Sequence, residues 1–176
     1  MTLATDLPPA RQADGRYRVV IVCLGNICRS PIAHVVLRQA LERAGIADRV
    51  EVESAGTGDW HLGHPMDRRA AAALASSGYD GSAHRAQQFT ETWYDEHDLI
   101  LTMDESNFRD VSALAPDEET ARHRVRMFRE FDPHGRHGDL EVPDPYYGGD
   151  DGFTVVLRMV ERTADGLADA LARHLG

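Results

Sequence analysis

The sequence predicts a single α/β domain in which a four-stranded parallel sheet carries helices on both faces. Three observations indicate this fold. Short apolar runs rich in β-branched residues alternate along the chain with segments whose apolar residues recur at helical spacing. The first of these runs leads through a tight, glycine-containing loop directly into the start of a helix. The length of 176 residues and the apolar content of 42% are those of one globular domain with a buried core.

The first strand is predicted at residues 19–22, where Val-Val-Ile-Val forms a run of β-branched residues. Such a run is typical of a strand buried on both faces, as the inner strands of a parallel sheet are. A loop of residues 23–30 follows, and a helix with one apolar stripe is expected from about 31 to 44. Ser30 is the expected N-cap and Pro31 the first helical residue, because helix starts favour these residue types there.

Three further strands are expected, at residues 50–54, 98–102 and 124–128. Two further helices are expected, at about residues 67–77 and 152–174. Because strands alternate with helices, the sheet should be parallel and covered on both faces. The stretch from 131 to 152 is rich in Gly and Pro and has no periodicity. Structureless stretches of this length inside a compact domain are usually functional or disordered, and we expect function here.

Residues 1–16 are polar, contain proline and lack the apolar core of a signal peptide. We expect a flexible N-terminal tail there, before a single domain of residues 17–176. The longest apolar run, residues 19–24, is far too short to cross a membrane. Both cysteines, Cys23 and Cys28, lie in one loop, which indicates a reducing compartment and not a disulfide scaffold. The prediction is a cytoplasmic protein with no membrane partner; export without a signal peptide stays open.

Charge and composition exclude several classes of function. The formal net charge of −10 argues against nucleic acid as the main partner. All 19 basic residues are arginine. The absence of lysine excludes P-loop NTPases, protein kinases and Schiff-base enzymes, since each of them needs one. The histidines are scattered without carboxylate or cysteine partners at ligand spacing, so no metal site and no cofactor are expected.

The strongest motif is the loop of residues 23–30, which reads Cys-Leu-Gly-Asn-Ile-Cys-Arg-Ser. Unpaired backbone N–H groups at the start of the following helix form a ready anion site. A cysteine at the mouth of such a site should be held as a thiolate. Arg29 adds a planar fork that matches two phosphate oxygens at once, and Asn26 suits the left-handed backbone of a tight loop. The loop therefore predicts a cysteine nucleophile, Cys23, that attacks phosphorus.

Residues 23–31 resemble the signature loop of the low-molecular-weight protein tyrosine phosphatases nearly letter for letter. The similarity covers roughly residues 17 to 173 and is greatest to actinobacterial members. It implies a hydrolase that removes phosphate from tyrosine in proteins, without a metal. Further motifs of the family recur in order: Ser54-Ala55-Gly56-Thr57, Asp59-Trp60, Ala83-His84-Arg85-Ala86, Met103-Asp104 and Asp144-Pro145-Tyr146-Tyr147.

The chemistry needs a nucleophile, charge stabilisation and a proton for the leaving oxygen. Cys23 would supply the first by forming a phosphocysteine intermediate, and Arg29 with the loop N–H groups would supply the second. The resemblance implies that Asp144 protonates the leaving oxygen and then accepts a proton from the hydrolytic water. The phosphate-binding loop would be completed by Leu24, Gly25, Asn26, Ile27, Cys28 and Ser30, with the Ser30 hydroxyl donating to the Cys23 thiolate.

The resemblance also implies residues that support the loop and shape the substrate slot. A side-chain network of Asn26, Ser54 and His84 would hold the loop open. The walls of the slot would be Trp60, Tyr146 and Tyr147, with Leu24 and Ile27 at its base. A deep aromatic slot favours the long phosphotyrosine side chain over phosphoserine.

One departure from the family bears on the substrate class, and one similarity to it bears on how the enzyme is regulated. A branch of the family that acts on phosphoarginine carries Thr where this chain has Ile27, and this difference favours phosphotyrosine. The resemblance further implies that Cys23 and Cys28 form a reversible disulfide under oxidation, which would make the enzyme redox-sensitive. Simple packing of Cys28 in the loop is the alternative.

Two other functions stay open at this point. An arsenate reductase shares this fold and loop but relays a disulfide through cysteines further along the chain, and none follows Cys28. A phosphate-binding protein without activity would need neither the thiol of Cys23 nor the carboxyl of Asp144. The expected partner is a phosphotyrosine-containing protein, and the expected state is a monomer or weak dimer.

Overall fold

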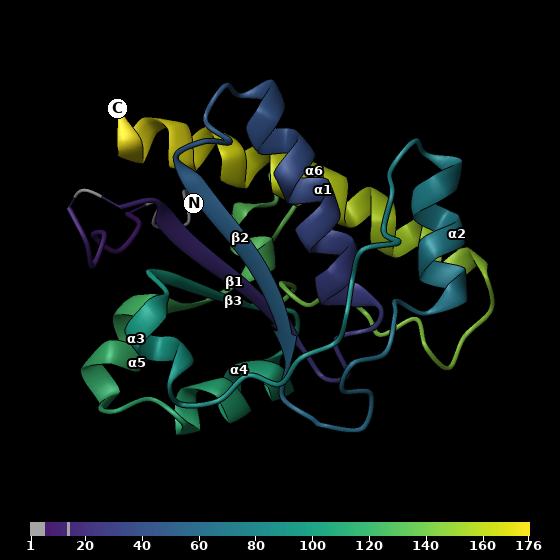
Figure 1. The fold of residues 1–176 in the computed structure, drawn as a ribbon, viewed down its shortest axis with the longest axis horizontal. Coiled ribbons are helices and arrows are strands. Elements are labelled where there is room, and N and C mark those ends of the chain that lie inside the picture. Colours follow the sequence, from purple (N-terminus) through teal and green to yellow (C-terminus); the bar gives the residue numbers. More distant parts are fainter. Residues whose placement is uncertain (1–5, 14) are drawn as a thin grey trace.

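The computed structural model describes residues 6–13 and 15–176. Four parallel strands form one sheet in the order β2-β1-β3-β4, so the first strand is an inner one (Figure 1). The predicted four-stranded parallel sheet is confirmed. The strands are β1 (Tyr17–Cys23), β2 (Val50–Gly56), β3 (Leu99–Thr102) and β4 (Val125–Met127).

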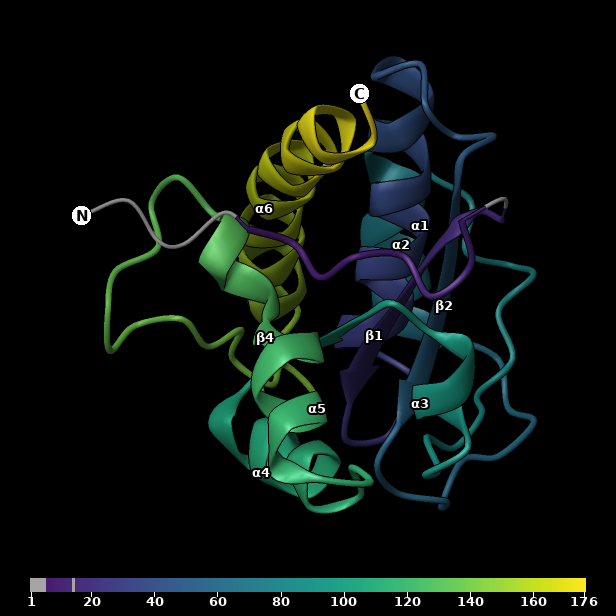
Figure 2. The same ribbon diagram turned by 90° about the vertical axis from the view of Figure 1, so that its left-hand side faces the viewer.

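Helices cover both faces of this sheet, as the sequence predicts (Figures 1 and 2). On one side lie α1 (Arg29–Arg43), α2 (Arg68–Ser76) and α6 (Asp151–Leu175). On the other side lie α3 (Trp93–Glu96), α4 (Glu105–Ala113) and α5 (Glu118–Arg124). A 3₁₀ helix, η1 (Phe128–Phe131), follows β4 and leads into the long irregular stretch before α6.

The short helices α3, α4 and α5 were not predicted. Two of them carry a recognisable start signal in the sequence. Asp104 and Asp117 are the N-caps of α4 and α5, and their carboxylates accept hydrogen bonds from the N–H groups of Asn107 and Thr120. Helices of seven to nine residues bury few side chains, so their apolar periodicity is weak.

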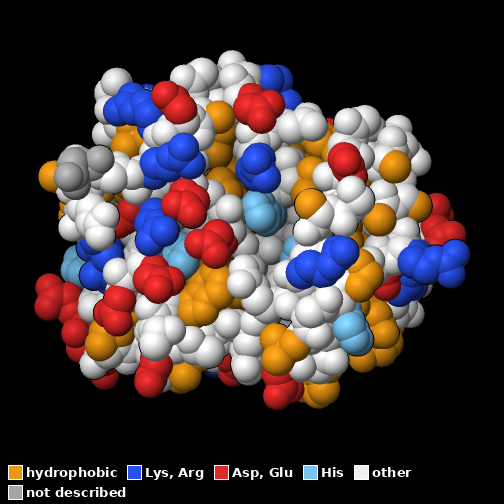
Figure 3. All heavy atoms as spheres, viewed as in Figure 1, with side chains coloured by type: hydrophobic (Ala, Val, Ile, Leu, Met, Phe, Trp, Pro, Cys, Tyr) orange, Lys and Arg blue, Asp and Glu red, His pale blue; other side chains and the backbone are white. Residues whose placement is uncertain are grey.

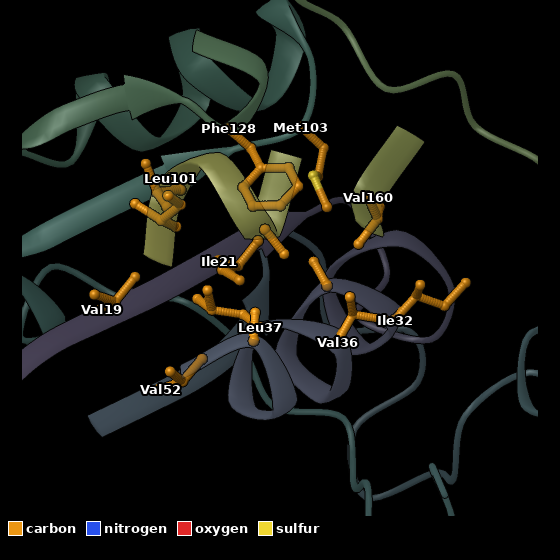
Figure 4. Close-up of a cluster of buried hydrophobic side chains, with 14 of the residues drawn as sticks. Val19, Ile21, Ile32, Val36, Leu37, Val52, Leu101, Met103, Phe128 and Val160 are labelled. Carbon is orange, nitrogen blue, oxygen red and sulfur yellow. The ribbon is translucent and has the colours of Figure 1, made fainter. Parts of the chain in front are cut away.

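The side chains of β1 alternate between two separate cores. Val19 and Ile21 point to the face covered by α1 and α6, where they pack in a large cluster with Leu37, Phe128 and Val160 (Figure 4). Val20 and Val22 belong to a smaller cluster on the opposite face, with Phe89, Tyr94, Ile100 and Val111. All four β1 side chains are fully buried. The strand is therefore fixed from both sides, and so is the residue at its end, Cys23.

The start of α1 differs from the prediction. The helix begins at Arg29, and Cys28 occupies the N-cap position without a capping side-chain hydrogen bond. Ser30 is the second helical residue and not the N-cap, and Pro31 is the third. The Ser30 hydroxyl lies 2.9 Å from the Cys23 sulfur and 2.8 Å from the Asn26 amide nitrogen. It is bound within the loop and is not available to cap the helix.

The N-terminal segment is packed where the structure describes it. Leu7 is only 7% exposed, and the Tyr17 hydroxyl donates a hydrogen bond of 2.8 Å to the Pro8 carbonyl. The backbone N–H of Arg11 donates to the Asp98 carboxylate at 2.7 Å. These contacts hold Leu7, Pro8 and Arg11 against the domain and compensate part of the cost of ordering this segment, while the flexibility expected of residues 1–16 stays a prediction. The rest of the expected tail includes residues 1–5 and 14, which lie outside the described residues.

The described surface carries side chains of both charge signs. On the face shown in Figure 3, acidic and arginine side chains are interspersed, so this face carries no extended patch of one charge sign. Within the described residues, no helix is both long enough and apolar enough to span a membrane.

Candidate active site

The loop of residues 24–28 joins the end of β1 to the start of α1. Asn26 has a φ of 57°, the left-handed conformation expected for it, and is the one such non-glycine residue in the described chain. This turn directs the Asn26 backbone N–H to the Cys23 sulfur, at 3.3 Å. The loop therefore curls around the thiol at the carboxyl edge of the sheet, the edge where α/β proteins bind ligands.

The end of β2 approaches this loop closely. The N–H of Gly58 donates to the Leu24 carbonyl at 2.9 Å, and that of Thr57 donates to the Cys23 carbonyl at 2.9 Å. A Cβ atom on Gly56 would lie 2.7 Å from the Leu24 carbonyl oxygen. Only glycine permits this approach, which explains the residue type within the Ser54-Ala55-Gly56-Thr57 motif.

Asn26 is the centre of a buried hydrogen-bond network. Its amide nitrogen donates to the hydroxyls of Ser30 and Ser54, at 2.8 and 3.0 Å. Its amide oxygen accepts from the backbone N–H of Gln87 at 2.9 Å. The Asn26 carbonyl oxygen lies 2.6 Å from His84 Nε2, so this nitrogen must carry the proton. Burial lowers the pKa of His84, which keeps the ring neutral with its proton on Nε2.

Arg29 is buried beside Cys23, with its side chain only 3% exposed. Its Nη1 donates to the Asp104 carboxylate at 2.7 Å and to the Val142 carbonyl at 3.0 Å. Its Nη2 lies 3.5 Å from the Asp144 carboxylate. Its Nε is buried and has no hydrogen-bond partner among the described residues. Two contacts thus fix the guanidinium, while a buried donor is left for a ligand in the loop.

Asp144 lies in the irregular stretch between η1 and α6, and its side chain is 35% exposed. One carboxylate oxygen accepts from the backbone N–H of Tyr146 at 3.1 Å, and the other faces Arg29. Tyr146 packs edge to face against Tyr147, with ring centroids 4.9 Å apart. The Asp144 carboxyl therefore stabilises a local turn through one oxygen, while the group stays accessible to solvent and faces Arg29 through the other.

These groups line one pocket of about 300 Å³. Cys23 and Arg29 contribute to its lining together with Asp144, although 121 residues separate Cys23 from Asp144. Trp60 and Tyr147 form an exposed rim, at 66% and 90% exposure. The remaining lining residues are Leu24, Gly25, Ile27, Cys28, His61 and Tyr146. An apolar rim around a small polar floor suits an aromatic group that carries an anion.

The two cysteines of the loop differ in environment. Cys28 is 5% exposed, and burial raises the pKa of its thiol, so it is held in the neutral form. Cys23, in contrast, lies beside the Arg29 guanidinium and accepts from a backbone N–H group. Both thiols are free. Both thiols are thus buried, and they differ in their neighbours: Cys23 lies beside a guanidinium and a backbone donor.

Comparison with known proteins shows the family to which this chain belongs. A sequence model described as "Low molecular weight phosphotyrosine protein phosphatase" matches residues 18–175. The chain belongs to this family. A "Low molecular weight protein-tyrosine-phosphatase" of Streptomyces coelicolor is 49% identical over 159 residues, which cover 90% of this chain and 96% of that protein. "Low molecular weight protein-tyrosine phosphatase A" of Mycobacterium tuberculosis is 41% identical, over 89% of this chain and 93% of that protein.

Members of the family also share the fold. A crystal structure of a protein tyrosine phosphatase from Entamoeba histolytica, with Hepes in the active site, superimposes with a TM-score of 0.83. It is 29% identical and covers 91% of this chain and 99% of that chain. The resemblance stated from the motifs, including the similarity to actinobacterial members, is thereby confirmed.

Some residues around the site were missed from the sequence. His61 lines the pocket, and the backbone N–H of Gln87 donates a hydrogen bond to the Asn26 side chain. Arg69 donates a hydrogen bond to the Tyr146 carbonyl, in the segment that carries Asp144. Asp104 was noted only as part of a family motif, and its contact with Arg29 was not expected. His61 follows Trp60 directly, so its place beside an aromatic wall was a usable signal. Gln87 and Arg69 act through contacts distant in sequence, for which the chain gives no local signal.

Proposed function

We propose that this protein is a cysteine-dependent phosphatase that hydrolyses phosphotyrosine in proteins through a phosphocysteine intermediate. The observation that carries the proposal is the joint lining of one pocket by Cys23, Arg29 and Asp144. A thiol, an unpartnered buried Nε donor and a solvent-accessible carboxyl are the three groups that the reaction requires. The relatives named as protein-tyrosine phosphatases support the same reaction class.

In the first step, the Cys23 thiolate attacks phosphorus and the bond from phosphorus to the tyrosine oxygen breaks. Asp144 donates its proton to that oxygen, so the leaving group departs as a neutral phenol. The three non-bridging phosphate oxygens accept from the loop N–H groups and from Arg29, whose contact with Asp104 fixes its orientation.

In the second step, a water molecule attacks the phosphocysteine on phosphorus. The Asp144 carboxylate takes a proton from this water, the sulfur–phosphorus bond breaks, and Cys23 leaves as a thiolate with release of inorganic phosphate. The Ser30 hydroxyl, 2.9 Å from the sulfur, donates to the thiolate and makes it a better leaving group. The cycle returns the enzyme to its starting protonation state.

The shape of the pocket supports phosphotyrosine as the substrate class. Its floor is the loop around Cys23, and Trp60, Tyr146 and Tyr147 rise above it. Aromatic walls pack against a phenyl ring through their faces and edges. The short side chain of phosphoserine would leave these walls uncovered while its phosphate occupied the floor.

The test is hydrolysis of p-nitrophenyl phosphate and of a phosphotyrosine peptide at about pH 6 with EDTA present. Wild-type protein should release phosphate from both substrates. Cys23→Ser should release none above background and should still bind the phosphotyrosine peptide, because the anion site remains. Turnover by Cys23→Ser near the wild-type rate would refute the proposed nucleophile.

The arsenate reductase alternative is disfavoured, since none of the residues from 29 to 176 is a cysteine that could relay a disulfide. The cytoplasmic location and the monomeric or weakly dimeric state stay predictions from the sequence. Light scattering coupled to size-exclusion chromatography at several protein concentrations tests the second of these.

A further inference from the structure

The segment that carries Asp144 is exposed and has little structure of its own. We define the acid loop as residues 143–149, between buried Val142 and the start of α6. Within it only Pro145 is buried. A general acid accelerates a reaction only if its proton lies within hydrogen-bond reach of the leaving oxygen. An exposed loop of this kind therefore needs an anchor in order to place Asp144.

Arg69, the second residue of α2, provides that anchor. Its Nη2 donates to the Tyr146 carbonyl at 2.9 Å and its Nη1 donates to the Gly148 carbonyl at 3.3 Å. Among the residues that the structure describes, no other side chain outside the acid loop donates a hydrogen bond to its backbone. The guanidinium also lies over the Tyr146 ring, 5.5 Å from its centroid.

Arg69 is itself held in place from two sides. Asp67, the N-cap of α2, accepts from the Arg69 backbone N–H at 2.8 Å, and its carboxylate also contacts Nε and Nη2, both at 3.3 Å. On the other side, the guanidinium lies 4.7 Å from the ring centroid of buried Phe153 in α6. The side chain is only 34% exposed, so its orientation is defined by packing as well as by hydrogen bonds.

The same residues connect the acid loop to the phosphate-binding loop. The backbone N–H of Asp67 donates to the Ile27 carbonyl at 2.9 Å. A continuous path therefore leads from Ile27 through Asp67 and Arg69 to the backbone on either side of Tyr147. The two loops that must cooperate in phosphoryl transfer share this support.

We propose that Arg69 is a positioning residue that holds the acid loop so that Asp144 faces the leaving oxygen of a phosphate bound at Cys23. The proposal rests on the proposed role of Asp144 as general acid. Arg69 has no hydrogen bond to Cys23 or to Asp144 among the described contacts. It acts through the backbone of the acid loop. Its removal should weaken proton donation while leaving the nucleophile and the anion site intact.

The experiment compares kcat/KM of wild type and Arg69→Ala on two aryl phosphates. Phenyl phosphate has a poor leaving group that needs the proton, whereas 2,4-dinitrophenyl phosphate has a leaving group that departs without one. General acid catalysis is worth about 10²–10⁴-fold, so partial misplacement should cost roughly 10-fold or more on phenyl phosphate. The loss on 2,4-dinitrophenyl phosphate should stay within about 3-fold, because that substrate makes little use of the acid.

The chain offers a matched control in the preceding residue. Arg68 is exposed and has no hydrogen bond or ion pair in the described structure, so Arg68→Ala removes the same charge from the same helix turn. It should change neither substrate's kcat/KM by more than about 2-fold, as expected for a surface position. Inhibition by inorganic phosphate, measured on each variant, reports whether the anion site has survived.

Two further variants separate failure of this inference from failure of the proposed chemistry. Asp144→Asn should lose activity steeply on phenyl phosphate alone, and equal losses on both substrates would reject Asp144 as the acid. If Asp144→Asn loses kcat/KM on phenyl phosphate alone, an equal loss of kcat/KM on both substrates for Arg69→Ala would overturn the role of Arg69.

The double variant is a further check. In the Asp144→Asn background, Arg69→Ala should cause no additional loss specific to phenyl phosphate, because the two residues act through one proton. If Arg69→Ala does not fold, Arg69→Lys replaces it, because a lysine ammonium cannot bind both carbonyls as the guanidinium does. Arg69→Lys should also lose more activity on phenyl phosphate than on 2,4-dinitrophenyl phosphate, though by a smaller factor. Equal losses on the two substrates would overturn the proposal.

Discussion

Cys23 and Cys28 are five residues apart and both buried, yet their side chains have different neighbours. Cys23 faces a buried guanidinium, a hydroxyl and a backbone N–H group. Cys28 lies in a buried position that raises its pKa. Two cysteines of one short motif can therefore meet different electrostatic surroundings although both are buried.

The geometry of Arg29 leads to a prediction at the same scale. Nη1 is committed to Asp104 and Val142 and Nη2 faces Asp144, which leaves the buried Nε without a partner among the described residues and available to the phosphate. A lysine has a single ammonium and cannot serve both sets of partners. We expect Arg29→Lys to reduce kcat/KM on p-nitrophenyl phosphate by at least about 10²-fold, the usual cost of losing a transition-state donor.

Arg68→Lys is the control for this substitution, because that side chain is exposed and has no such partners. The unfolding temperature of each variant should be measured beside its activity. A folded Arg29→Lys protein that keeps more than a tenth of wild-type kcat/KM would show that a point charge suffices in this loop.

Helix ends contribute to the site at the scale of whole elements. The N-terminus of α1 presents its N–H groups to the loop, and Asp104 at the start of α4 has a double role. One of its oxygens caps the helix at Asn107, and the other binds Arg29. The helix start thus fixes the arginine, and the buried arginine in turn satisfies the cap residue.

A close contact in α6 gives a prediction for this scale. A Cβ atom on Gly166 would lie 2.0 Å from the Phe131 carbonyl oxygen, at the end of η1. Alanine is ordinarily the better helix former by about 1 kcal/mol. We nevertheless expect Gly166→Ala to lower the free energy of unfolding by about 1–3 kcal/mol, because the backbone must shift to admit the methyl group. Urea denaturation measures the difference.

Gly152→Ala in the first turn of the same helix serves as the comparison. Its new Cβ atom would meet nothing nearer than 3.5 Å, so its stability should stay within about 0.5 kcal/mol of wild type. A Gly166→Ala protein as stable as wild type would mean that η1 and α6 separate at little cost.

At the scale of the whole molecule, the site assembles where three parallel strands end. Cys23 is the last residue of β1, Thr57 follows β2, and Met103-Asp104 follow β3, all at one edge of the sheet. The Asp144 segment then crosses this edge, with Val142 N–H bonded to the Met103 carbonyl at 2.7 Å. The parallel arrangement is what brings residues so distant in sequence to one pocket.

The stability of the whole fold should depend on pH through His34. Burial lowers the pKa of His34 from 6.5 to about 4, and the charge of Arg38 adds to the effect. Between these pH values the unfolded chain binds a proton that the folded protein does not. The free energy of unfolding should therefore be highest above pH 6.5 and fall as the pH drops toward 4, by at most about 3 kcal/mol from this residue.

Urea denaturation of wild type and His34→Gln at pH 7, 6, 5 and 4.5 checks this dependence. The free energy of unfolding of His34→Gln should fall less steeply with decreasing pH than that of wild type, because the glutamine side chain does not titrate. It should keep some decline, since burial also lowers the pKa of His84. Parallel curves for the two proteins would exclude His34 as a source of the pH dependence.

The sequence by itself determined the sheet, its two helix-covered faces and the position of the phosphate-binding loop. These features depend on local patterns: the β-branched run of β1, the helical spacing in α6, and the Cys23–Arg29 spacing. Only the tertiary structure decided that Ser30 bonds within the loop, that Asp104 fixes Arg29, that residues 6–13 pack against the domain and that Arg69 holds the acid loop. The physical reason is that each of these contacts joins side chains to groups brought near by folding, and neither periodicity nor spacing specifies such partners.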